Sequence, residues 1–153
     1  MRVWAAFLAG LALVVAGGCA AEQDAPLRAA EPATGDLAEP ATGDLAGRTF
    51  TSTAVTVRGE PRPLVTGTRV VLGFTDDLLS ARAGCNQLSG QVRLDGDRLR
   101  VAGVVVTAMG CQPRLMQQDT WLAGFLADDP TYSMDGDTFT LRAGQAAVAL
   151  AMQ

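Results

Sequence analysis

The feature that most constrains this chain is a succession of short strand-like segments that fills residues 48–153. Each segment is bounded by Gly or Asp, and turns recur about every ten residues, a spacing typical of antiparallel sandwiches and barrels. The expected strands cover residues 48–58, 68–75, 78–83, 87–94, 98–107, 131–134, 138–142 and 145–152. Residues 98–107 are expected to supply one strand or two, with Gly103 as a kink or bulge.

One segment has helical periodicity instead. Pro113 suits the first position of a helix, where its missing N–H would have no partner anyway. The apolar residues at helical spacing are Leu115, Met116, Leu122, Phe125 and Leu126, and the polar residues between them are Arg114, Gln117, Gln118 and Asp119. Trp121, Leu122 and Phe125 are expected to form the core face. Asp128-Asp129-Pro130 ends the helix.

The sequence therefore predicts a mainly β domain with one inserted α-helix at about residues 113–127. The strands are expected to form a small antiparallel barrel, or a strongly curved sheet, of seven or eight strands. The tripeptides Asp95-Gly96-Asp97 and Asp135-Gly136-Asp137 are expected to form hairpin turns, because Asp-Gly is a strong hairpin signal.

The first 18 residues are typical of a signal peptide. Arg2 precedes an uncharged, mostly apolar run over residues 3–16, which is shorter than the roughly 20 residues that a membrane-spanning helix needs. The run ends in Val15-Ala16-Gly17-Gly18-Cys19, which resembles a lipobox. We therefore expect cleavage before Cys19 and acyl chains on Cys19 that hold the protein at a membrane. An ordinary secretory signal, with Cys19 incidental, is the alternative.

Residues 19–47 are predicted to form an acidic flexible tether. The octapeptide Glu-Pro-Ala-Thr-Gly-Asp-Leu-Ala occurs twice in tandem, at residues 31–38 and 39–46. Two copies of so short a unit do not build a solenoid, whose repeats have about 20 residues or more. Residues 20–46 hold six carboxylates against Arg28, a charge excess that keeps a chain solvated and extended.

The composition excludes several classes of chemistry. The chain has no His, which removes the commonest general base and zinc ligand, as well as Ser–His and Cys–His nucleophilic pairs. Adjacent acids at residues 76–77 and 128–129 are expected to be solvated turn residues, and no calcium-loop pattern is present. We therefore predict no enzyme activity, no cofactor and no metal site. An acidic balance of 12 Arg against 16 carboxylates also argues against nucleic-acid binding.

Three segments carry a resemblance to a known family. They are Ala83-Gly84-Cys85-Asn86 with Ser89-Gly90, then Thr107-Ala108-Met109-Gly110-Cys111, then the helix start Pro113-Arg114-Leu115-Met116. In this order they resemble the META domain, also called the HslJ-like domain, over about residues 48–153. The resemblance implies a compact, barrel-like antiparallel domain with one helix. It also implies an envelope or secreted protein associated with stress or drug tolerance.

The chain departs from the family pattern at two positions. Asp119 stands where a Glu is more usual, and Phe50 stands where a Trp is common. The motif residues Gly84, Asn86 and Gly90 are expected to form a turn at a strand end, because Gly and Asn tolerate left-handed backbone angles. In this interpretation the Asn86 amide bonds nearby backbone groups. The alternative is that Asn86 binds a ligand.

Cys85 and Cys111 are the cysteines that remain if Cys19 is lipidated. An even remainder in an exported domain favours a single disulfide, and two buried free thiols are the alternative. A redox-active pair is not expected, because the spacing is far from Cys-x-x-Cys.

The functional expectation is an exported, lipid-anchored protein with a non-catalytic META domain. The domain is expected to act as a binding or accessory module in cell-envelope stress or drug tolerance, with an envelope protein or a small ligand as its partner. The alternative is an inhibitor of an exogenous hydrolase such as lysozyme. Lysozymes are commonly basic, whereas residues 48–153 are formally neutral, with ten Arg and ten carboxylates.

Overall fold

The computed structural model describes residues 42–153. The expected signal peptide, Cys19 and the first copy of the repeat lie outside the described residues. Within the described part of the chain, no helix has both the length and the hydropathy needed to cross a lipid bilayer.

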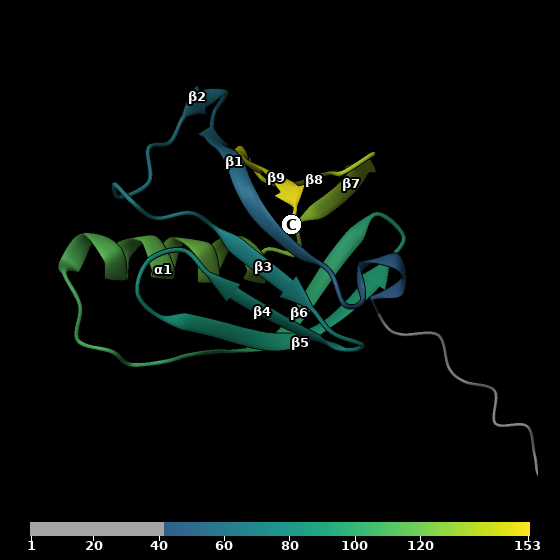
Figure 1. Cartoon of the computed structure of the whole chain (residues 1–153), viewed down its shortest axis with the longest axis horizontal. Helices are drawn as coiled ribbons and strands as arrows, with labels where there is room; N and C mark the ends of the chain where they lie inside the picture. Colours follow the sequence, from purple (N-terminus) through teal and green to yellow (C-terminus); the bar gives the residue numbers. More distant parts are fainter. Residues whose placement is uncertain (1–41) are drawn as a thin grey trace, which may run out of the picture. The chain divides into compact units, whose positions relative to one another are not determined.

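Eight antiparallel strands form a closed barrel (Figure 1). They are β1 (Thr49–Val57), β3 (Val71–Phe74), β4 (Leu78–Arg82), β5 (Gln87–Asp95), β6 (Arg98–Val106), β7 (Thr131–Asp135), β8 (Thr138–Ala143) and β9 (Ala146–Met152). Each strand pairs with the next, and β1 also pairs with β9, which closes the sheet on itself. A two-residue strand, β2 (Glu60–Pro61), pairs with the end of β1. The expected mainly β barrel with one helix is confirmed.

The turns and the bulge follow the expected pattern. Gly96 and Gly136 have φ angles of 61° and 56° in the hairpins β5–β6 and β7–β8, a conformation that favours glycine. Residues 98–106 form the single strand β6. Its register against β5 shifts where Gly103 has a φ of 62°, so the predicted bulge at this residue is confirmed.

The strand expected at residues 68–75 is shorter than predicted, because β3 begins at Val71. The Thr68 N–H donates to the carbonyl of Val65 and forms a turn. The Val70 N–H donates to the side-chain Oγ of Ser52 instead of a strand carbonyl. The Val70 carbonyl still accepts the Ser52 N–H at 2.8 Å, but the N–H groups of Thr68 and Val70 bind a turn carbonyl and a side chain in place of strand carbonyls.

Three aromatic rings from separate strands form the centre of the core. Phe50, Phe74 and Phe139 are fully or almost fully buried, and their ring centroids lie 4.8–5.9 Å apart. Two of the three contacts are edge-to-face, a favourable geometry for aromatic pairs. The barrel interior is therefore packed with side chains around these rings.

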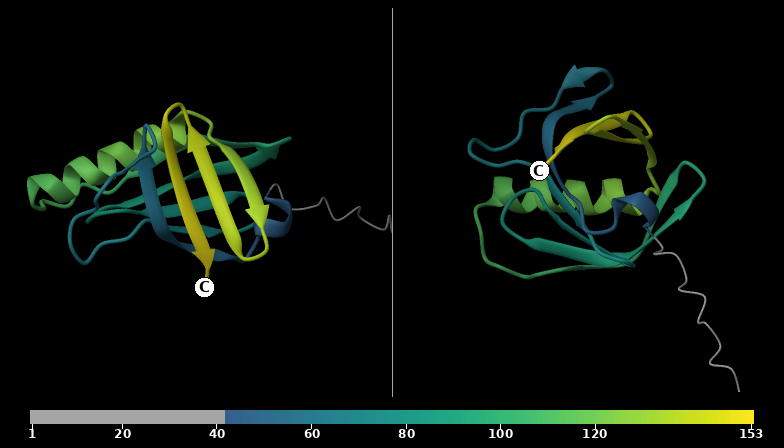
Figure 2. Two further views of the ribbon diagram at one scale, coloured as in Figure 1. Left: turned by 90° about the horizontal axis from the view of Figure 1, so that it is seen from above. Right: turned by 45° about the vertical axis from the view of Figure 1, so that its right-hand side comes forward.

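Helix α1 (Pro113–Ala127) has the predicted bounds and lies between the two halves of the barrel, β3–β6 on one side and β1 with β7–β9 on the other (Figures 1 and 2). Strands β6 and β7 share a single paired position, Arg98 with Thr131. The helix packs against β6 and adds Leu122, Phe125 and Leu126 to the core.

The domain begins earlier than expected. The tether is predicted to extend to residue 47, with almost nothing that could be buried in a core, and this is wrong for residues 42–46. The 3₁₀ turn η1 (Gly43–Leu45) places Leu45 in the core with 2% of its surface exposed. Thr42 is buried, and its Oγ1 donates to the carbonyls of Thr75 (2.9 Å) and Asp76 (3.2 Å). The second repeat copy thus ends inside the fold.

Replacing Leu45 by Ala is expected to lower the free energy of unfolding by about 2–3 kcal/mol, because it removes a fully buried side chain at the end of the barrel. Urea unfolding of the two proteins measures the difference. Residues 34–38 repeat the sequence of 42–46, so the same substitution is also made in a chain that lacks residues 31–38. A loss below about 0.5 kcal/mol in both backgrounds would contradict the placement of Leu45 in the core.

Candidate functional site

The carboxylate of Asp119, in α1, joins the helix to the motif turn. One oxygen, Oδ1, accepts the Gly84 N–H at 2.6 Å. The other, Oδ2, accepts the N–H groups of Cys85 (3.0 Å) and Asn86 (2.8 Å), and also the Asn86 side-chain amide (3.2 Å). Asp119 has 2% of its surface exposed. Four donors therefore compensate the cost of burying this charge.

Asn86 extends the same network to the second motif segment. Its Oδ1 accepts the N–H of Met109 at 2.8 Å and the hydroxyl of Thr107 at 3.0 Å. The side chain is buried, and both its oxygen and its nitrogen are hydrogen-bonded within the domain. Asn86 is not in the left-handed conformation that the prediction invoked, and it holds the turn through long-range bonds to residues 107, 109 and 119. The first two motif segments and the helix that the third segment begins are therefore joined by Asn86 and Asp119.

Gln118 and Asp119 lie on the buried face of α1, which differs from the polar face predicted for them. Gln118 has 5% of its surface exposed, whereas Met116, expected among the apolar residues, is 43% exposed. Both buried polar residues lie on the same helical face as Leu122, at spacings of four and three residues. Their spacing from Leu122 indicates the buried face of the helix. Their polar residue types indicate the exposed face, which is why the prediction placed them there.

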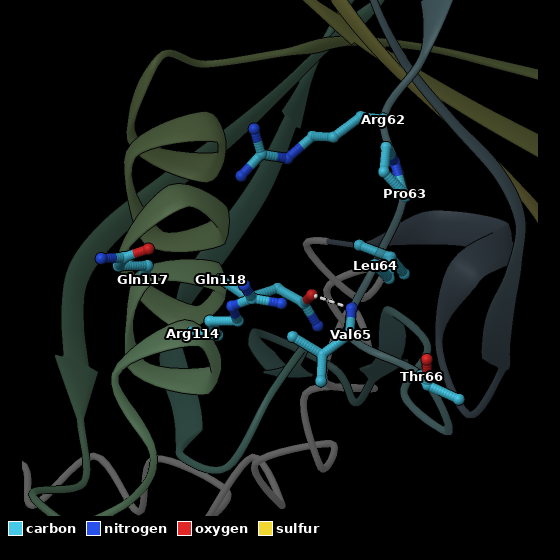
Figure 3. A pocket seen from close by; sticks show the side chains of 8 residues that line it. All are labelled: Arg62, Pro63, Leu64, Val65, Thr66, Arg114, Gln117 and Gln118. Atoms are coloured by element: carbon cyan, nitrogen blue, oxygen red, sulfur yellow. Dashed lines mark hydrogen bonds between the residues drawn. The ribbon is translucent and has the colours of Figure 1, made fainter.

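Gln118 binds the connection between β2 and β3 to the helix. Its Oε1 accepts the N–H of Val65 at 2.8 Å, and its Nε2 donates to the hydroxyl of Thr68 at 2.8 Å and to the carbonyl of Ala83. Figure 3 shows Gln118 reaching from α1 to Val65. Residues 62–69 are thus held against the helix by a buried side chain.

Gly90, the remaining motif residue, lies in β5 opposite the Gly103 bulge. A Cβ at this position would lie 2.9 Å from Cγ1 of Val101 and 3.0 Å from the carbonyl oxygen of Ala102. Close approach of β6 therefore accounts for the glycine. It does not form part of the turn that contains Gly84 and Asn86.

A disulfide joins Cys85 of the motif turn to Cys111, just before α1, with their Cα atoms 6.5 Å apart. Both half-cystines are partly exposed. The bond holds the segment that leads into the helix against the turn that Asp119 binds. It therefore reinforces the same helix–turn junction covalently.

A Cys85→Ser, Cys111→Ser double variant is expected to lose about 3 kcal/mol of stability, because the disulfide closes a loop of 26 residues in the unfolded chain. Thermal or urea unfolding measures this loss. Adding reductant to the unsubstituted protein should reproduce it, whereas reductant should not affect the double variant. Equal stability of the oxidised protein and the double variant would contradict this role.

A cleft of about 440 Å³ opens beside Gln118, between α1 and the β2–β3 connection. Arg62 and Arg114 line it from opposite elements, with Pro63, Leu64 and Val65 as its apolar wall. The Arg62 guanidinium carbon lies 4.6 Å from the centroid of the Trp121 ring, a cation–π arrangement (Figure 3 shows Arg62 reaching toward α1). No local sequence pattern indicates this site, because its two arginines are far apart in the chain.

The ion pairs of residues 42–153 lie elsewhere. Arg100 contacts Asp95 (2.8 Å) and Asp129 (2.9 Å), and its pKa is raised by the hydrogen bond to Asp95 and by the charges of both acids. Arg62 and Arg114 form no ion pair and no side-chain hydrogen bond with any residue in this range. Among the described residues, neither guanidinium therefore has a counter-charge.

The predicted turn acids are not gathered into a site. Asp76, Asp77 and Asp128 are exposed, and Asp129 is half-buried in its pair with Arg100. No group of three Cys, Asp or Glu side chains in the described range is placed to hold a metal ion.

Within residues 42–153, the structure is a small closed antiparallel barrel with one α-helix, which a buried carboxylate joins to the motif turn. A model of the META domain family matches residues 43–153. The chain therefore belongs to the META domain family, as its motifs predicted. A search of curated proteins gives no significant match.

Solved structures share the fold at low sequence identity. An NMR structure of a protein from Burkholderia xenovorans is 18% identical with a TM-score of 0.60, covering 71% of this chain and 83% of that one. A crystal structure of a DUF4847 family protein from Bacteroides vulgatus is 13% identical with a TM-score of 0.51, covering 71% of this chain and 94% of that one. At these identities the likeness concerns the fold alone.

Proposed function

We propose that this protein is an exported lipoprotein, held at a membrane by acyl chains on Cys19, whose META domain is a non-catalytic binding or accessory module of the cell envelope. The family resemblance adds a role in envelope stress or drug tolerance to this proposal. The lipobox-like sequence before Cys19 and the acidic segment after it support export and tethering.

The observation that carries the non-catalytic part is the full use of the motif side chains within the fold. Asp119 accepts four hydrogen bonds, and Asn86 and Gln118 are bound through both ends of their amides. A general acid or base must be within reach of a substrate proton, and a nucleophile needs an adjacent base. The motif therefore supports a structural role, whereas the arginine-lined cleft offers polar groups that have no partner among residues 42–153.

Labelling with an alkyne analogue of palmitate tests the anchor. We expect the wild-type protein to be labelled and to fractionate with membranes. A Cys19→Ser variant should lose the label, whereas Cys85→Ser should keep it. Absence of label on the wild-type protein, or label that persists on Cys19→Ser, would overturn lipid anchoring.

In-cell crosslinking, followed by mass spectrometry of recovered proteins and lipids, tests the binding module. The matched control carries residues 1–41 fused to an unrelated folded domain, so that it shares the proposed anchor. We expect a protein or small molecule that is recovered with the META domain and not with the control. Identical recovery from both would overturn a binding role for the domain.

The alternative of a lysozyme inhibitor gains no support from the charge distribution. The hollows around residues 62–69 are lined by arginines, which would repel a basic enzyme. An excess of the protein is therefore expected to leave the rate of lysozyme unchanged.

A further inference from the structure

We propose that the cleft between α1 and the β2–β3 connection binds an oxyanion, a carboxylate or phosphate carried on a small and partly apolar ligand, through Arg62 and Arg114. This inference rests on the proposed binding role and names the site and the ligand chemistry. Four observations on this end of the barrel carry it.

The first observation is the uniform sign of the charge. Three hollows are each lined in part by residues from 62–69, and every charged side chain that lines them is an arginine: Arg62, Arg69, Arg82 and Arg114. Asp119 follows Gln118, which lines the cleft, but Asp119 itself does not line it, and its oxygens accept the amide N–H groups of the motif turn. Like charges gathered at a concave surface without counter-charges raise the local concentration of anions.

The second observation is the fixed position of Arg62. Its side chain is half-buried against Trp121, and its Nε is buried without a hydrogen-bond acceptor among residues 42–153. A buried N–H of a charged group is costly when it has no acceptor. The Nη groups of Arg62 also have no acceptor among residues 42–153, and because Arg62 lines the cleft, a bound oxyanion would supply one to them. Because the guanidinium is already stacked, binding would order little further.

The third observation is the position of Arg114 in the first turn of α1. The amino end of a helix carries a partial positive charge, which favours acids and disfavours cations. Here the first turn has no acidic residue, and the N-cap residue Gln112 makes no side-chain capping bond. Arg114 thus stands where an anion in the cleft would meet both a guanidinium and the positive end of the helix.

The fourth observation is that the cleft is preformed and partly apolar. Gln118 ties Val65 and Thr68 to the helix, which fixes the wall opposite Arg114. Pro63, Leu64 and Val65 supply apolar surface, and the volume of about 440 Å³ suits a small ligand. The oxyanion that this cleft would bind occurs in soluble carboxylates and phosphates and also in the headgroup of an anionic phospholipid.

The test is an NMR titration of the full lipidated chain in phosphatidylcholine nanodiscs. Sodium acetate and sodium phosphate are added at constant ionic strength, since salt screens exposed charges. A second arm replaces part of the phosphatidylcholine by phosphatidylglycerol. The variants are Arg62→Gln and Arg114→Gln. The matched control is Arg93→Gln, which removes an exposed arginine of β5 that lines none of the hollows described here.

We expect saturable shifts confined to amides that line the cleft, with affinity reduced about tenfold or more in each cleft variant and unchanged in the control. Shifts with the salts identify a soluble anion, and shifts with phosphatidylglycerol alone identify a headgroup. No saturable shift in either arm, or an equal loss in Arg93→Gln, would overturn the inference. A partner that still crosslinks to both cleft variants would leave the proposed binding role intact while this site fails.

Discussion

Replacing Asp119 by Ala is expected to lower the free energy of unfolding by about 3–5 kcal/mol, the largest loss among the substitutions considered. The carboxylate accepts three backbone N–H groups and one side-chain amide from the turn at residues 84–86. Its removal leaves these donors without their acceptor at a buried junction, where each costs about 1–3 kcal/mol if no water replaces it. The loss is smaller than the sum because the turn can relax.

Urea unfolding under oxidising conditions measures the effect of Asp119→Ala. Asp119→Asn should give an intermediate loss, because it keeps one acceptor oxygen and turns the other position into a donor. Asp128→Ala serves as the control, since Asp128 is exposed at the end of the same helix and should change stability by no more than about 0.5 kcal/mol. Equal effects of Asp119→Ala and Asp128→Ala would contradict the conclusion that Asp119 holds the turn at residues 84–86 against the helix.

Gly84→Ala is expected to cost about 3–4 kcal/mol, by steric overlap rather than by backbone strain. A Cβ at this position would overlap the carbonyl oxygen of Leu115 in α1 and would lie 2.9 Å from Oδ1 of Asp119. The helix would have to move away from the turn, which would weaken the hydrogen bonds to Asp119. The predicted loss therefore combines overpacking with a disturbed buried network.

Gly124, which lies in α1 itself, provides the matched control for Gly84→Ala. A Cβ at Gly124 would meet nothing within 4 Å, so Gly124→Ala is expected to stabilise the protein by about 0.5–1 kcal/mol through its higher helix propensity. Opposite signs of the two glycine substitutions in the same unfolding assay are the predicted result. A neutral or stabilising Gly84→Ala would show that the helix does not approach the turn so closely.

Much of the fold was predictable because local signals agreed with the tertiary structure. Pro113 and the Asp128-Asp129-Pro130 sequence bound a helix whose limits match the prediction. The Asp-Gly hairpins and the Gly103 bulge also follow from local backbone preferences. Alternation of buried and exposed residues is clear in β5, where Leu88, Gly90 and Val92 face the interior.

The residues that were missed are those whose environment depends on distant partners. Asp119 is buried because amide donors 33 to 35 residues earlier in the chain converge on it, and hydrophobic periodicity assigns such a residue to the surface. Leu45 belongs to a segment whose composition is that of a tether, and only its contacts show that it enters the core. The cleft combines Arg62 with Arg114, which no local pattern connects.

The motif residues of this META domain are therefore explained by the helix–turn junction that they form. The proposed ligand site is instead the cleft lined by Arg62 and Arg114. Helix α1 joins the two regions. One turn of this helix presents Asp119 to the motif turn and Gln118 to the connection that forms the cleft wall. Damage to the junction is consequently expected to disturb the cleft as well.

Amide hydrogen exchange at Gly84, Cys85 and Asn86 tests the central claim most directly, because these three N–H groups point to Asp119. We expect these groups to exchange only when the domain unfolds, with protection that matches the free energy of unfolding, and Asp119→Asn to shorten their exchange times. Exchange as fast as that of the β5–β6 turn, in a barrel that is otherwise protected, would contradict it.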